Sequence, residues 1–547
     1  MSSSQLSISD EHRDKNGIEV VSSDISSLSP PEAKSISYKA KKFDVTDKEA
    51  VDETLAFMLK YDATTPEMTD ADEKKLTRKL YIVVAVIAWT NLVFFMDKYT
   101  MGFASTFGFF EAIGIDGGVN RYNTMNTLYY VGYILGQSNL YWAQKFGNRK
   151  AMITLCFLWN VIMFLTCTLT SYQGAYVLRF FLGFVESVAM TLANITLQQL
   201  FPASQKFRIG QIFMIAAQFA QLPISFIAYG LLKQKTPPSI PLWKVFVIII
   251  GCLTTFTLFL IIWLYPTNPT DARFLTIEEK VWTIRRLQKT NGASIGTKRF
   301  KKYQAVEAIK DPVTWYYVGA MFSLMLCNNI TYIENIIFTE LGLTSVLNTY
   351  LVTAAGSGFY VVCGIFTFFA MKWWPRVWNN TFTIIFWVFI CLVPCILMAA
   401  LPWSVDKKVF LAMTLICSVF GCSWIGIVSA YQSSCAGYTK MLVRTGLSMA
   451  AYSIANIIAS RIYYDSAAPR YYVAWGIQSG GFFFCIVFIL LAYFTLSKRN
   501  VVRLAALELE SEKDFGLVET EGGEEKAVNL ANLDLTDLEN ERFIYPL

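Results

Sequence analysis

Twelve apolar segments fill the middle of this 547-residue chain, and each has roughly the 20 residues that one α-helix needs to cross a bilayer. Because lipid offers no hydrogen bonds to an exposed backbone, segments of this length predict helices. Hydrophobic residues make up 54% of the sequence and charged residues only 16%, which excludes an ordinary soluble domain. The segments run over Leu80–Gly108, Tyr122–Trp142, Ala151–Thr170, Ala175–Phe201, Ile209–Leu232, Trp243–Tyr265, Trp315–Phe338, Thr349–Met371, Phe382–Leu401, Phe410–Tyr431, Val443–Tyr463 and Ala474–Ser497.

The spacing of the segments predicts an all-α membrane protein of two six-helix bundles. A hydrophilic stretch from Pro266 to Pro312 separates six segments from six, and it carries ten lysines and arginines against five acids. After Lys498 the chain turns acidic, and we expect this tail to be disordered. The predicted parts are an N-terminal tail (1–79), a first bundle (80–265), a linker (266–312), a second bundle (313–497) and a C-terminal tail (498–547).

Basic residues in the loops predict the orientation. The loops between segments two and three, four and five, eight and nine, and ten and eleven are basic and nearly free of acids. The loop between segments five and six is a conflict, because it also carries lysines. Because the majority of the basic loops lie on the side of the two tails, we expect both termini in the cytoplasm. Thr69–Asp72 ahead of Glu73 predicts a capped helix start, either lying along the anionic inner leaflet or simply solvated.

Several classes of function are excluded by missing residue types. None of the eleven cysteines forms a CxxC pair, and the one histidine, His12, lies in the polar N-terminal tail. We therefore expect no metal site, no cofactor and no enzymatic activity. No basic run interleaved with aromatics suggests a nucleic-acid partner. The expected partners are a small-molecule substrate, protons and the lipid bilayer.

Four ionisable residues lie within apolar segments one and four. Charge at bilayer depth is costly, so it marks a functional site by default. Asp97 and Lys98 are adjacent and point about 100° apart on a helix. Arg179 and Glu186 are seven residues apart, so they share one face at a separation of roughly 10 Å. Asp97 with Lys98 could also be an internal salt bridge, and Arg179 could only orient Glu186.

These charges suggest proton coupling. A carboxylate that loses its cation in a dry cavity takes up a proton, so Asp97 and Glu186 are candidate proton carriers if partners exchange as the bundles rock. When both are protonated, Lys98 and Arg179 are left as cations that an organic anion could satisfy.

The second bundle supplies further candidates for substrate contact. Glu334 could receive a substrate ammonium group or lie near the outer water, and the aromatic residues could instead be packing. The candidates are Asn328, Asn329, Tyr332, Glu334, Trp424 and Tyr431.

Four stretches of sequence carry a resemblance to a known family. They are Phe95–Lys98, Arg179–Ser187, Ser434–Lys440 and the tail Asp534–Leu547. In these four stretches, the chain resembles major facilitator transporters of the anion:cation symporter group, and within that group the fungal allantoate permease family. It is most similar there to the branch of cysteine and sulfonate transporters.

The resemblance implies a proton-driven importer of organic anions in a plasma membrane. It assigns protonation to Asp97 and Glu186 and substrate contact to Lys98. Other members carry allantoate, ureidosuccinate, dipeptides or carboxylate vitamins, and a non-transporting nutrient sensor is a further alternative. The sequence departs from the family pattern at two places. Gln144 replaces the usual aspartate of the loop between segments two and three, which puts a gating salt bridge in doubt. Segment five lacks the glycine-rich pattern of antiporters.

Overall fold

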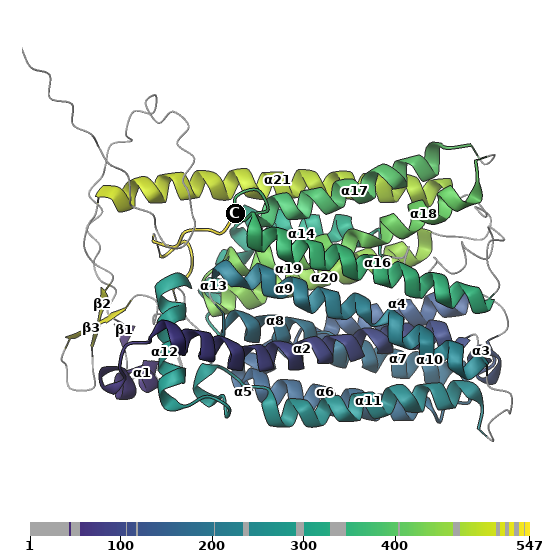
Figure 1. Cartoon of the computed structure of the whole chain (residues 1–547), viewed down its shortest axis with the longest axis horizontal. Helices are drawn as coiled ribbons and strands as arrows, with labels where there is room; N and C mark the ends of the chain where they lie inside the picture. The colour runs from purple at the N-terminus through teal and green to yellow at the C-terminus, as the bar shows by residue number, and fades with distance from the viewer. Residues whose placement is uncertain are drawn as a thin grey trace, which may run out of the picture.

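The helices lie side by side along the long axis of the molecule (Figure 1). The computed structural model describes residues 43–44, 55–105, 107–115, 119–201, 203–233, 240–291, 300–328, 346–402, 405–462, 471–509, 515–519, 525–529, 535–540 and 542–547. Within these ranges, ten helices are long and apolar enough to cross a membrane.

In the described residues, the first six predicted segments form helices, and three of those segments are each divided into two. The division in segment four directly follows Glu186, where two turn residues separate α7 from α8. The helices are α2 (Asp70–Ser105), α4 (Val119–Gly136) with α5 (Asn139–Phe146), α6 (Asn148–Thr166), α7 (Tyr172–Glu186) with α8 (Ala189–Gln198), α9 (Ala203–Phe219) with α10 (Gln221–Leu232), and α11 (Leu242–Leu264).

The second six segments are helical over most of their described residues, and segment seven turns at residues 326–328. The last helix continues past Ser497, its predicted end, for another three turns. These helices are α14 (Pro312–Met325), α16 (Val346–Trp373), α17 (Asn380–Ala400), α18 (Lys407–Cys417) joined through η4 (Ser418–Phe420) to α19 (Gly421–Ser433), α20 (Tyr438–Ile462) and α21 (Tyr472–Leu509).

Shorter elements lie outside these long helices, most of them at one end of the bundle. We call that end the linker end, because it holds the two helices that connect α11 to α14 in sequence (Figure 1). The all-α prediction did not include the small sheet, in which β2 pairs with β1 in parallel and with β3 antiparallel. The elements are α1 (Leu55–Tyr61), η2 (Asp62–Thr64), α3 (Phe109–Ala112), η3 (Pro269–Asp271), α12 (Ile277–Asn291), α13 (Lys302–Lys310), β1 (Phe43–Asp44), β2 (Phe515–Glu519) and β3 (Glu525–Asn529).

Helix α2 begins where the capping pattern predicted. The hydroxyl of Thr69 accepts a hydrogen bond from the backbone N–H of Asp72 at 3.3 Å, and α2 starts at the next residue, Asp70. The helix then runs without a break into the apolar segment, so residues 70–79 do not form a separate helix. Lys79 forms an ion pair with Glu279 of α12 at 2.6 Å, which fixes the start of α2 to the linker end.

The two sets of helices meet along three helices of the first set and three of the second. Helix α4 packs against α20, α9 against α16 and α19, and α10 against α16. In Figure 1 the purple to teal helices α2, α6, α7 and α11 lie below this seam, and α14, α17 and α21 lie above it. The charged residues of α2 and α7 therefore lie in the first set, next to its interface with the second set.

Candidate functional site

The four charged residues of segments one and four line the same cavity. Asp97 and Lys98 come from α2, and Arg179 and Glu186 from α7. The free volume of this central cavity is about 20 Å³, enough for a water molecule and too small for an organic solute. Its lining residues are Asp97, Lys98, Asn126, Tyr129, Tyr130, Arg179, Leu182, Glu186, Asn456 and Ser460.

Asp97 is held by a neutral donor. Its side chain is buried, and the indole N–H of Trp159 on α6 donates to Asp97 Oδ2 at 2.6 Å. Asp97 and Glu186 line the same cavity and act on each other electrostatically. Two ionised carboxylates in one small cavity would repel each other, so the pair can share a proton.

Glu186 is likewise held by a neutral donor. The hydroxyl of Tyr129 on α4 donates to Glu186 Oε2 at 2.6 Å. Glu186 Oε1 is buried and accepts no hydrogen bond from any donor in the described part of the chain. Glu186 is the last residue of α7, so its side chain lies where the helix is interrupted.

Glycines bring Tyr129 to this position. Helices α4 and α7 approach so closely that a Cβ atom on Gly183 would lie 1.9 Å from the carbonyl oxygen of Tyr129. A Cβ on Gly132 would lie 2.1 Å from the carbonyl oxygen of Phe180. Only glycine allows two helix backbones to come this near in a membrane. The close contact sets the Tyr129 hydroxyl against Glu186, one turn beyond Gly183.

Neither cation has a carboxylate in ion-pair contact among the residues that the structure describes. The Lys98 amine lies over the rings of Phe94 and Phe95, 4.9 Å from each centroid, and 6.0 Å from that of Tyr452. Arg179 is half-buried, and the described residues give it no hydrogen bond or ion pair. Among these residues, no ion pair joins Asp97 to Lys98, so their internal salt bridge is not formed here.

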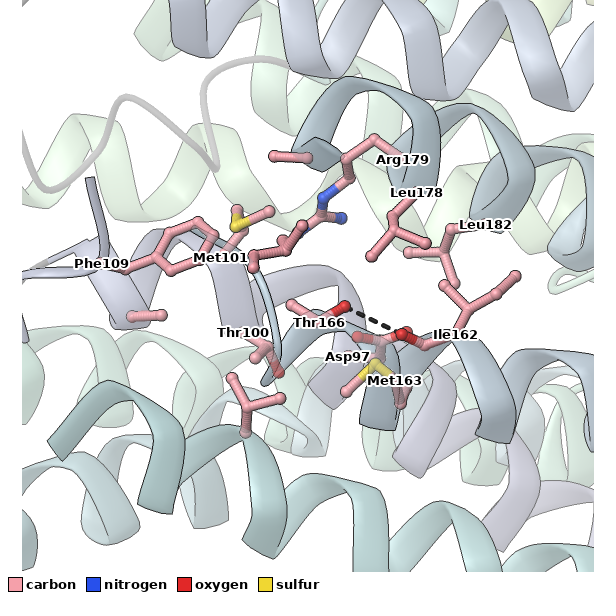
Figure 2. Close-up of a pocket in the computed structure, with 14 residues that line it drawn as sticks. Asp97, Thr100, Met101, Phe109, Ile162, Met163, Thr166, Leu178, Arg179 and Leu182 are labelled. Atoms are coloured by element: carbon pink, nitrogen blue, oxygen red, sulfur yellow. Dashed lines mark hydrogen bonds between the residues drawn. The ribbon is translucent and has the colours of Figure 1, made fainter. Parts of the chain in front are cut away.

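Asp97 and Arg179 also line a second small cavity, which extends toward α3. In Figure 2, Arg179 enters it from α7, with Asp97 and Thr100 on α2. The hydroxyl of Thr166 donates to the carbonyl oxygen of Ile162 at 3.0 Å, and that of Thr100 donates to Met96 within its own helix. Asp97 and Arg179 are therefore the charged groups of this otherwise mostly apolar cavity.

The candidates from the second bundle are placed differently. Asn328 donates to Asn456 Oδ1 at 2.6 Å, and Asn456 lines the central cavity, so Asn328 is one contact away from it. Asn329, Tyr332 and Glu334 lie outside the described residues.

The two aromatic candidates differ from each other. Trp424 stacks on Tyr452 at 5.9 Å and meets Phe95 edge-on, so it packs beside Lys98. Its indole N–H is buried and has no acceptor within the described ranges. Tyr431 is buried against Tyr317 and lines neither of the two cavities, so its place fits packing.

Sequence reasoning missed three neutral residues of the site. Trp159 and Tyr129 donate hydrogen bonds to the two acids, and Asn456 lines the cavity. All three look like packing residues when each apolar segment is considered alone. One signal was present: Gly132 and Gly136 form a GxxxG motif on segment two, which predicts a close helix contact. It would have directed attention to Tyr129, one turn before Gly132.

The structure shows thiols but no clustered metal ligands. All eleven cysteines are free. No group of three or more His, Cys, Asp or Glu side chains that could hold a metal ion occurs in the described residues.

Contacts join the two helix sets at both ends of the helices. At the linker end, Gln144 of α5 donates to the hydroxyl of Thr439 on α20 at 3.1 Å. Gln144 stands where an aspartate was expected, so a neutral hydrogen bond takes the place of the doubtful salt bridge. At the opposite end, the ring of Phe103 near the end of α2 stacks on that of Tyr350 near the start of α16, with the centroids 5.2 Å apart.

Known proteins resemble the chain in sequence and in fold. The sequence model of the Major Facilitator Superfamily matches residues 87–460. The high affinity cysteine transporter of Saccharomyces cerevisiae is 41% identical over 512 residues, covering 91% of this chain and 95% of that protein. The allantoate permease of the same yeast is 26% identical over 522 residues, covering 92% and 91%.

A solved structure has the same fold. The proton:xylose symporter XylE, bound to 6-bromo-6-deoxy-D-glucose, superposes with a TM-score of 0.53 at 15% identity, covering 77% of this chain and 96% of that one. The predicted resemblance and the predicted fold class are both confirmed.

Proposed function

Because the chain belongs to the major facilitator superfamily of membrane transporters, we propose that it is a proton-coupled symporter that imports a small organic anion or zwitterion by alternating access. The favoured substrate is a sulfur compound such as cysteine or a sulfonate, since the yeast relative with 41% identity is named as a cysteine transporter. Allantoate is the next candidate, from a relative with 26% identity.

One observation carries the proposal: two acids and two cations share a cavity without pairing into salt bridges. Asp97 and Glu186 accept hydrogen bonds from neutral donors, whereas Lys98 and Arg179 have no carboxylate in ion-pair contact within the described residues. A proton shared by the acids lowers their charge, and the cations are then free to bind a carboxylate or sulfonate.

The coupling follows from competition for the same cations. When the bound anion leaves, Lys98 and Arg179 can approach Asp97 and Glu186 and favour release of the proton. When a proton and an anion are both bound, the charges in the cavity are balanced, and burial of the site is least costly. Since the cavity has room only for a water molecule, binding requires the two helix sets to separate at one end.

We place the linker end in the cytoplasm of a cell whose plasma membrane holds the protein. Exposed basic residues gather at this end of the helices, among them Lys145, Lys150, Lys372 and Arg376. Such an excess of lysine and arginine is typical of cytoplasmic loops. Both termini would then be cytoplasmic, and the end near α3 would admit substrate.

The decisive experiment is radiolabelled uptake in a cell that lacks its own transport of sulfur compounds. Cysteine, a sulfonate and allantoate are compared at several external pH values, and uptake of the true substrate should rise as the pH falls. Glu186→Gln should remove this pH dependence, because the amide cannot exchange a proton. Glu111→Gln, on the exposed surface of α3, is the matched control and should behave like the parent.

The outcomes separate the alternatives. If only allantoate is taken up, the substrate assignment changes and the proposed mechanism is retained. A pH dependence retained by Glu186→Gln would remove Glu186 from proton coupling. A folded protein at the cell surface that moves none of the three compounds would contradict the proposal.

A further inference from the structure

Two sequence stretches that carried the family resemblance meet at the linker end. They are Ser434–Lys440, between α19 and α20, and the last residues of the chain. The tail was expected to be disordered, but residues 535–540 and 542–547 pack against α13, α20 and α21. Figure 1 shows the C-terminus beside α13 and α14.

Asp537 of the tail completes a buried cluster of charges. It forms an ion pair with Lys440 at 2.7 Å, and both side chains are fully buried. Lys440 also pairs with Glu307 at 2.8 Å, and Arg444 with Asp311 at 2.9 Å.

The charges in this cluster balance only when the tail is bound. Lys440, Arg444 and Arg499 supply three positive charges. Asp311, Glu307 and Asp537 supply three negative charges. Without Asp537, three buried or half-buried cations face two carboxylates, which is costly away from water.

The end of the tail is fixed to α21. The Tyr545 hydroxyl donates to Asp537 Oδ2 at 2.7 Å, and Asn500 bonds to both the N–H and the carbonyl oxygen of Tyr545 at 2.9 Å. Arg503 donates to the carbonyl oxygens of Asp537 and Phe543, and its guanidinium lies 4.6 Å from the ring centroid of Tyr545. The tail is thus held at two points about eight residues apart.

Thr439 and Tyr438, which precede Lys440 on α20, contact the first set of helices. Thr439 accepts the hydrogen bond from Gln144, and the Tyr438 hydroxyl donates to Asn148 Oδ1 at 3.2 Å. Thr536 of the tail donates to Glu307 of α13 at 3.1 Å.

Helix α13 also contacts Thr439. Its Gln304 accepts a hydrogen bond from the N–H of Thr439 at 3.1 Å. A Cβ on Gly437 would meet Thr536 and Gln304 at 3.1 and 3.2 Å, and its φ of +86° already requires glycine. The first turn of α20 therefore lies between the tail and the first helix set.

From this arrangement we propose that residues 535–540 and 542–547 form an intramolecular strap that holds the linker end closed, with Asp537 as its positioning residue. The strap fixes Lys440 and the turn before α20, and so keeps Tyr438 and Thr439 against the first helix set. Opening the linker end requires the bonds to Gln144 and Asn148 to break. Loss of the strap lets α20 move and makes that opening easier.

The proposal is tested by measuring the separation of the two helix sets at the linker end of the full-length protein. Spin labels at Lys150 and Arg376, both exposed and one in each set, report that distance in lipid nanodiscs. Asp537→Asn should shift the distance distribution toward longer values than in the parent. Tyr545→Phe, which keeps the charge of Asp537 but removes one hydrogen bond, should give a smaller shift in the same direction.

Leu538→Ala is the matched control, because Leu538 belongs to the strap but is 42% exposed. It should leave the distances unchanged. If Asp537→Asn does not yield a monodisperse protein, Tyr545→Phe decides the question. Parent-like distances in the folded variants would overturn the proposal. This readout needs no substrate, so it stands or falls separately from the assignment of proton-coupled import.

Discussion

The Tyr129 hydroxyl lies 2.6 Å from Glu186 Oε2, and this hydrogen bond joins α4 to α7 where α7 ends. A donated hydrogen bond favours the ionised form of a carboxylate. Tyr129 is therefore placed to help Glu186 release a proton once the bound anion has left.

Tyr129→Phe should make Glu186 hold its proton more firmly. We expect uptake to remain substantial at a higher external pH than in the parent, and the maximal rate to fall because proton release slows. Uptake measured over a range of external pH gives both quantities. The control is Tyr172→Phe, at the start of α7 and far from Glu186 along the chain. A pH profile identical to the parent would show that this bond plays no part in coupling.

Gly183→Ala should push α4 and α7 apart, because the new Cβ would lie 1.9 Å from the Tyr129 carbonyl oxygen. Overpacking of this kind typically costs about 1–3 kcal/mol. We expect a lower melting temperature in detergent together with strongly reduced uptake. Gly230→Ala on α10 is the control, because a Cβ there has no neighbour within 4 Å. A parent-like melting temperature for Gly183→Ala would contradict the close contact.

Trp159→Phe should leave Asp97 without its indole donor while keeping an aromatic ring in the same place. A hydrogen bond to a charged acceptor is worth about 1.5–3 kcal/mol, so uptake should fall at least about tenfold if Asp97 must ionise during the cycle. Initial uptake rates at a fixed amount of surface protein measure this. Trp263→Phe, on α11 with 74% of its side chain exposed, should match the parent. Unchanged uptake by Trp159→Phe would exclude this role.

Acid should loosen the linker end before the rest of the protein. Burial alone would raise the pKa of Asp311, but the charge of Arg444, the hydrogen bond from Arg499 and the charge of Lys440 lower it below its usual value. A carboxyl group whose pKa is lower in the folded protein stabilises it above the pKa of the unfolded chain, roughly 3.9. That contribution is lost as the pH falls through the lowered value.

The measurement is thermal unfolding of the parent and of Asp311→Asn between pH 7 and pH 3. The parent should lose more stability than the variant across the acid range, because the asparagine has no proton to bind. At pH 7 the variant should be the less stable protein, since Arg444 and Arg499 lose their charged partner. Equal acid sensitivity of the two proteins would contradict the assignment.

The sequence by itself determined the layout of the helices and which of them carry buried charge. Apolar length and loop charge are local properties, so twelve segments and the four ionisable residues Asp97, Lys98, Arg179 and Glu186 could be found without coordinates. The start of α2 was also predictable, because its cap depends on neighbouring residues.

Only the tertiary structure decided what each charge contacts. Trp159 is 62 residues from Asp97 in sequence and Tyr129 is 57 residues from Glu186, and both are ordinary components of apolar helices, so nothing local marks them. The tail was misjudged for the same reason. An acidic tail is expected to be disordered only when the folded protein offers it no cation to pair with. Lys440, which pairs with Asp537, lies almost 100 residues away in sequence. Pairing energies depend on distance in space, and that distance is set by how the helices pack.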